Sequence, residues 1–172
     1  MTQTDTSETE PPAGVAKPQA VADLEAAYGQ PSQAGFGSAV FYEPIAADDS
    51  LTDAALAKYK YFIGDLWERY GEDAWMEPWK EVYARPSGAE PDIAAELRSI
   101  DDQDAALSAE MILDNVDNAD ASRAALSAVY DDPAVTELRV FNLGDGEAMS
   151  GLLVVGRRVE SADATFLVFL LD

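Results

Sequence analysis

Residues 165–171 read TFLVFLL, and this stretch decides the fold of the chain. From Phe166 to Leu171 no polar residue interrupts it, so neither face of the expected strand is polar. A strand exposed on one face alternates apolar and polar residues, whereas a strand buried on both faces does not. The stretch therefore predicts a strand in the interior of a sheet, with a neighbouring strand on each side.

The sequence before this strand predicts its neighbours. From Thr136 the apolar residues recur with a period of two, and the hairpin dipeptide Asp145-Gly146 leads into a second strand over residues 150–159. A turn at 161–163 then returns the chain to the final strand. These three segments predict an antiparallel β-meander, and a strand at 36–42 is expected to add a fourth member.

The strongest helical pattern covers residues 51–70. Ser50 is a suitable N-cap, and apolar residues recur every three or four positions as far as Tyr70. Gly71 then provides a natural C-cap. One long amphipathic helix is expected here.

The segment that follows also reads as helical. Pro78 fits the first turn of a helix running toward Tyr83, or it kinks a helix that begins near Asp73. Shorter helical patterns cover residues 21–30, 92–100, 103–116 and 121–130. Within 103–116, Leu107 and Met111 are expected to face inward, and Asp120 is expected to cap the helix at 121–130.

The pattern as a whole predicts an α+β fold. We expect an antiparallel three- to four-stranded sheet, ending in a C-terminal β-meander and covered by several α-helices. Residues 1–20 are polar, acidic and rich in proline, so they are interpreted as a disordered tail. Residues 21–172 then form a single globular domain.

Composition limits the chemistry available to the chain. There are 33 Asp and Glu residues against 11 Lys and Arg, a formal charge of −22, and neither histidine nor cysteine. Catalytic triads, Cys–His pairs and zinc sites with these ligands are therefore excluded, and no catalytic residue, cofactor or metal site is predicted. Nucleic acid is not an expected partner, because phosphate binding needs clustered basic residues. Without a secretory signal or an apolar run long enough to span a membrane, the expected compartment is the cytoplasm.

The acidity itself has three interpretations. It can serve solubility, it can reflect adaptation to a saline cytosol, or it can attract a basic partner protein through its field. The sequence alone leaves these three open.

One acidic segment is the best candidate for a recognition surface. Aspartates flank the expected helices between residues 101 and 132, where capping aspartates should crowd the same loops. A weak cation site around 114–120 is the alternative, although the spacing of the oxygens differs from that of calcium loops. The candidate partner-binding aspartates are Asp101, Asp102, Asp104, Asp114, Asp117, Asp120, Asp131 and Asp132.

The tryptophans form a second candidate. Trp75 and Trp79 are separated by one helical turn beside Pro78, and both are expected to be partly exposed. Glu72 and Glu77 would lie around them. Such an aromatic patch with acidic neighbours would suit a basic, amphipathic partner.

These observations favour a small acidic protein-binding module, such as an inhibitor, immunity factor, chaperone, adaptor or nucleic-acid charge mimic, that docks on a basic protein. An accessory or structural subunit of a larger assembly is the first alternative. A carboxylate-dependent enzyme is the second, and a pocket holding two carboxylates with one raised pKa would favour it.

Overall fold

The computed structural model describes residues 17–86, 88–114, 118–145 and 149–171. Most of the segment interpreted as a tail lies outside this range. Helix α1 (Gln19–Tyr28) nevertheless begins within it, two residues before the expected domain boundary. Among the described residues no helix is both long enough and apolar enough to cross a membrane.

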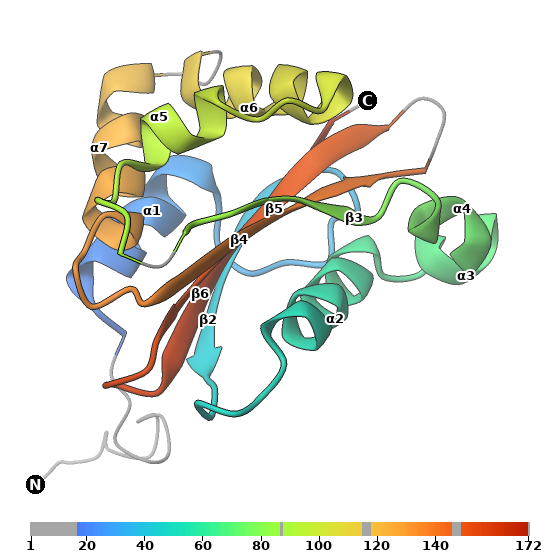
Figure 1. Cartoon of the computed structure of the whole chain (residues 1–172). Coiled ribbons are helices and arrows are strands. Elements are labelled where there is room, and N and C mark those ends of the chain that lie inside the picture. The colour runs from blue at the N-terminus through green and yellow to red at the C-terminus, as the bar shows by residue number, and fades with distance from the viewer. Residues whose placement is uncertain (1–16, 87, 115–117, 146–148, 172) are drawn as a thin grey trace, which may run out of the picture.

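A five-stranded antiparallel sheet forms the centre of the molecule, with the strand order β2-β6-β5-β4-β3 (Figure 1). Strands β4 (Glu137–Gly144), β5 (Ser150–Arg158) and β6 (Asp163–Leu171) form the expected C-terminal meander. Strand β2 (Gly37–Pro44) pairs with the other side of β6 and is the predicted fourth member. The α+β fold class is therefore confirmed.

Strand β6 occupies the interior position that its sequence predicts. Val168 lies opposite Ala39 of β2 on one side and Leu153 of β5 on the other. Successive side chains of β6 enter two different hydrophobic cores, Leu167 the first and Phe166 the second. Both faces of the strand are covered, which explains why its sequence does not alternate.

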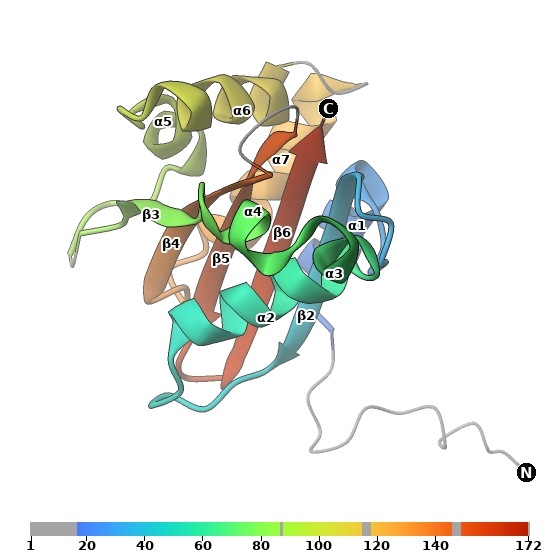
Figure 2. The ribbon, with the colours of Figure 1, turned by 90° about the vertical axis from the view of Figure 1, so that its right-hand side faces the viewer.

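Helices cover both faces of this sheet, as the two views in Figures 1 and 2 show. One face carries α1, α5 (Ile93–Arg98), α6 (Gln103–Asp114) and α7 (Ala119–Tyr130). The other carries α2 (Leu51–Ile63), α3 (Leu66–Tyr70) and α4 (Glu72–Met76). The result is a three-layer arrangement with a core on each side of the sheet.

The expected single helix at 51–70 is wrong, because the chain breaks it at Gly64. Ser50 caps α2 as predicted, its hydroxyl accepting from the Asp53 amide at 3.1 Å. At Gly64 the backbone adopts φ 63° and ψ −133°, a conformation that glycine tolerates and other residues rarely adopt. Gly35 donates its amide to the carbonyl of Phe62 at 2.9 Å, so an upstream loop packs where the helix ends.

Of the two alternatives for Pro78, the helix running toward Tyr83 is wrong, and the helix that begins near Asp73 exists as α4 but ends at Met76, before Pro78. Residues Lys80–Ala84 form strand β3, which pairs with β4 at the edge of the sheet and raises the strand number to five. The Asn142 side-chain amide donates to the Pro78 carbonyl at 3.0 Å, and the ring of Trp79 stacks on Phe141. These contacts with β4 outweigh the local helical pattern.

Helix α6 is rotated relative to the prediction. Its buried side chains are Ala105, Ser108, Ala109, Ile112 and Leu113, whereas Met111 is half-buried and Leu107 is 59% exposed. The small side chains of Ala105, Ser108 and Ala109 allow a close approach of the helix, which contacts β5. Leu107, expected in the core, therefore lies on the outer surface.

Candidate functional site

The candidate aspartates of segment 101–132 occupy three separate places. Asp101, Asp102 and Asp104 lie at the start of α6, Asp114 and Asp120 lie where α6 gives way to α7, and Asp131 and Asp132 follow α7. Asp117 lies outside the described residues. Since a helix of this length spans about 18 Å, the aspartates do not form one continuous cluster.

Several of these aspartates serve the fold. Asp102 binds the Lys80 ammonium at 2.6 Å and accepts the Ala105 amide at 2.9 Å, and these two bonds lower the pKa of Asp102. Asp114 accepts two hydrogen bonds from Arg98, each 3.1 Å long, and these lower the pKa of its carboxyl group. Both carboxylates already have cationic partners within the chain.

The remaining paired aspartates also have local roles. Asp131 accepts the Ile93 amide at the start of α5 at 2.7 Å, and Asp132 accepts the Ala134 amide at 2.9 Å. Asp120 was expected to cap α7, but it lies in the first turn of that helix and binds Arg123 at 2.5 Å. The N-cap position belongs to Asn118, whose side chain makes no capping hydrogen bond.

Asp101 and Asp104 are exposed, and neither has a basic group within 4.0 Å among the described residues. Asp104 lies near enough to Lys80 to add to the rise in the pKa of that lysine, which is due mainly to Asp102. Of the eight predicted residues, these two are the described aspartates that fold stability does not explain.

The expectation that Trp75 is partly exposed is wrong. Its side chain is completely buried, its indole nitrogen donates to the Leu66 carbonyl at 3.0 Å, and its ring stacks on Trp67. Trp79 is half-buried, as expected, and stacks between Tyr59 and Phe141. The tryptophans therefore belong to the core beneath α3 and α4.

The acidic neighbours of this aromatic group remain at the surface. Glu72 is exposed and accepts a hydrogen bond of 3.4 Å from the Trp67 indole, and Glu77 is exposed at the end of α4. Tyr70 supplies the exposed aromatic ring here, since 55% of its surface is accessible. Of the aromatic side chains in α3 and α4, Tyr70 and not Trp75 thus reaches the surface.

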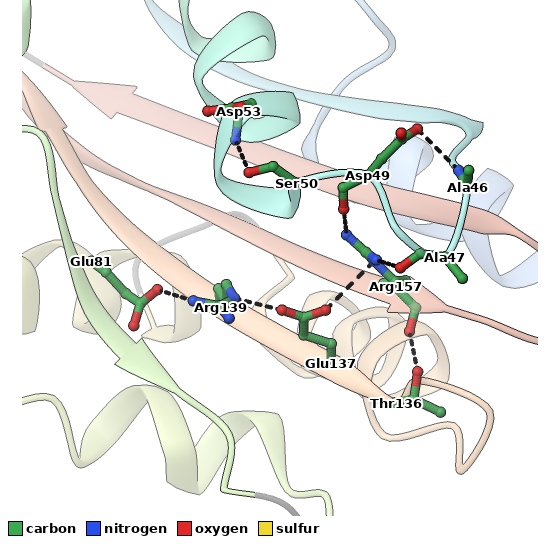
Figure 3. Close-up of polar contacts among 10 residues, drawn as sticks. All are labelled: Ala46, Ala47, Asp49, Ser50, Asp53, Glu81, Thr136, Glu137, Arg139 and Arg157. Atoms are coloured by element: carbon green, nitrogen blue, oxygen red, sulfur yellow. Dashed lines mark hydrogen bonds and ion pairs between the residues drawn. The ribbon is translucent and has the colours of Figure 1, made fainter.

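Almost all basic side chains of the chain are already paired. Every lysine and arginine except Lys60 and Arg69 has a carboxylate oxygen within 4.0 Å among the described residues. Figure 3 shows one such network, in which Arg139 lies between Glu81 and Glu137, at 2.6 Å from each. Most of the positive charges, at the surface as well as in the interior, are thus paired with carboxylates of the same chain. The excess of carboxylates, a net charge of −22, sets the sign of the surface potential.

Arg157 in the same network fixes the loop before α2. Its guanidinium is buried and donates to the carbonyls of Ala47 and Asp49, while its Nε atom lies 3.5 Å from a Glu137 oxygen (Figure 3). Charged donors to carbonyls hold the loop against the sheet. This arginine is therefore a structural residue and unavailable to a ligand.

Two buried carboxylates have lowered pKas. Burial alone would raise the pKa of Glu96, but hydrogen bonds from Arg85 and Tyr83 outweigh it and lower the pKa. Asp163 behaves in the same way, since Arg158 and Tyr42 hold its charged form. A general acid needs a raised pKa, so neither group is suited to that role at neutral pH.

The outer face of α6 contains a hollow that the sequence analysis did not anticipate. It has a volume of about 720 Å³ and is lined by Arg98, Asp101, Gln103, Ala106, Leu107 and Glu110. The sequence carries a weak signal for it, because the helix has two apolar arcs and either one could face the sheet. Among the described residues no three carboxylates are arranged to hold a metal ion.

Comparison of this chain with protein-family models, curated proteins and solved structures finds no match.

Proposed function

We propose that this chain is a small acidic protein-binding module that docks on a basic surface of another protein. Inhibitors, immunity factors, chaperones and adaptors are the classes of protein that act in this way. The observation that carries the proposal is the pairing of nearly all basic side chains within the fold, which leaves a surface of exposed carboxylates.

The exposed carboxylates are held on rigid elements of both helical layers. Asp101, Asp104 and Glu110 lie on and beside α6, and Glu68 and Asp73 lie on α3 and α4. A negative potential fixed on a scaffold raises the association rate with a basic protein and disfavours acidic partners. The same potential opposes binding to nucleic acid.

The alternatives have less support. An accessory subunit could contact sister chains through its apolar final strand or its tryptophans, but the final strand lies between β2 and β5, and Trp75 is enclosed in the core. A carboxylate-dependent enzyme would need a desolvated acid with a raised pKa, whereas the buried Glu96 and Asp163 have lowered pKas.

Affinity capture from a lysate of the source cells tests the proposal. The immobilised chain should retain one or a few basic proteins at about 0.05 M salt and release them as screening increases. Immobilised heparin with the same total charge serves as the control, because a protein held only by charge would be retained equally by the heparin and by the chain. Retention of no protein beyond those that heparin retains would refute the proposal.

A further inference from the structure

The outer face of α6 carries an apolar side chain that the fold leaves in the open. Leu107 is 59% exposed and lies in the hollow of about 720 Å³ formed with α5 and the connection before α6. Ala106 is the other apolar residue among those that line it, and we call Leu107 and Ala106 together its apolar floor. Burial of Leu107 therefore requires a surface that the described part of the chain does not supply.

Two acidic residues, Asp101 and Glu110, also line the hollow, and we call them its rim. The single cation among the lining residues, Arg98, is held by both oxygens of Asp114 at 3.1 Å. Glu110 lies close enough to Arg98 to add to the rise in the pKa of that arginine, of which Asp114 is the main cause. With Asp104 one turn before Leu107, the carboxylates outnumber the cations around the apolar floor.

This charge decides which occupant the hollow suits. The first 16 residues of the chain carry Asp5, Glu8 and Glu10 and no lysine or arginine, so they would meet charge of their own sign. A second copy of the chain carries the same −22 and would be repelled. An occupant with apolar and cationic groups side by side matches both the floor and the rim.

We infer that the α6 hollow binds a short amphipathic helix of the basic partner protein. An apolar side chain of that helix packs on Leu107, and lysine or arginine side chains one turn away meet Asp101 and Glu110. This inference rests on the proposed function, because it names the binding element of the same basic partner.

A fluorescent peptide of leucine and lysine, about four helical turns long with leucine at helical spacing, is the probe. Its binding to the full chain is measured by fluorescence anisotropy at about 0.05 M salt. Leu107→Gln keeps a good helix former at this position. It should weaken peptide binding about fivefold, because the complex then loses the partial burial of one leucine side chain. Val159→Gln removes an exposed apolar side chain in the β5–β6 turn and should leave binding unchanged.

Paired charge variants test the rim. Asp101→Asn combined with Glu110→Gln should weaken peptide binding more than Glu68→Gln combined with Asp73→Asn, which removes the same charge from α3 and α4. In the amide spectrum of the labelled chain, the largest shifts on peptide addition should fall in α5 and α6.

Three results would overturn the inference. They are equal effects of the two charge pairs, an unchanged affinity in Leu107→Gln, and equal binding of a peptide of the same composition with its leucines scattered. Binding that persists in these cases while remaining sensitive to salt would leave the proposed function standing. No binding of the peptide at all would also overturn the inference, and the lysate capture would then decide the proposed function separately.

Discussion

Loss of the charge of Glu96 should destabilise the fold strongly. Its carboxylate accepts hydrogen bonds from Arg85 Nε at 2.7 Å, Arg85 Nη2 at 2.6 Å and the Tyr83 hydroxyl at 2.8 Å. The side chains of Arg85 and Glu96 are 6% and 9% exposed. This cluster connects the end of β3 to α5, and Arg98, the last residue of α5, lines the α6 hollow.

The substitution Glu96→Gln preserves the shape of the side chain and leaves Arg85 buried without its main counterion. Removing one partner of a buried ion pair costs about 3–5 kcal/mol. Asp131 lies 3.8 Å from Arg85 and offsets part of the loss, so we expect a decrease of about 3 kcal/mol in the free energy of unfolding. For a chain of this size the midpoint of thermal unfolding should fall by about 6–12 °C.

The effect should also depend on pH. Because hydrogen bonds from Arg85 and Tyr83 outweigh burial, the pKa of Glu96 is lower in the folded chain than in the unfolded chain. The stabilisation is therefore complete above the unfolded pKa and is lost as the pH falls through the folded pKa. The difference in stability between the wild type and Glu96→Gln should shrink over this acidic range.

Urea unfolding followed by circular dichroism, repeated from neutral to acidic pH, measures both effects. The exposed Glu68 provides the matched control, and Glu68→Gln should change the free energy of unfolding by less than about 0.5 kcal/mol. A cost below about 1 kcal/mol for Glu96→Gln at neutral pH, or a cost that does not vary with pH, would refute this account of the ion pair.

Two further predictions concern the helix break and the net charge. Gly64→Ala should lower the free energy of unfolding by about 1–3 kcal/mol, because alanine rarely adopts φ 63° with ψ −133°. Urea unfolding measures this change. If the variant is instead more stable, by up to about 1 kcal/mol, the helix is continuous through residue 64. Raising sodium chloride from low concentration to about 1 M should raise the midpoint of thermal unfolding of the wild type, because salt screens the repulsion within a chain of charge −22. A midpoint that stays constant or falls would contradict this prediction.

The features that the sequence predicts correctly are those with local causes. Strands β4, β5 and β6 follow from alternation and from an apolar stretch that needs cover on both faces. Gly146 of the predicted hairpin dipeptide lies outside the described residues. The cap at Ser50 follows from the chemistry of a single side chain, which accepts the expected amide hydrogen bond.

The features that the sequence does not predict depend on contacts between distant residues. Strand β3 pairs with residues about sixty positions later, and its most informative contact, Trp79 on Phe141, cannot be read from residues 78–84 alone. The break at Gly64 likewise depends on the loop at Gly35. In both places tertiary packing decides between local conformations of similar energy.

The candidate site shows the same division. The acidity of segment 101–132 is evident from composition, but the roles of its members depend on which cations the fold brings near them. Asp102 forms an ion pair with Lys80, and Asp114 forms one with Arg98. Asp101 and Asp104 have no cation within 4.0 Å among the described residues. The position of Leu107 depends on the sheet, which selects the face of α6 with the smaller side chains.

Acidity alone does not separate recognition from solubility or adaptation to salt, because exposed carboxylates serve all three. We propose that the position of Leu107 favours recognition among the three. A soluble or salt-adapted surface gains nothing from a leucine in an open hollow, and full burial of such a side chain is worth about 1.5–3 kcal/mol. Isolated exposed apolar residues are common, but this one lines a hollow that Asp101 and Glu110 also line. The proposed recognition of a cationic, amphipathic partner would account for the charge and the leucine together, and the Leu107→Gln measurement tests it.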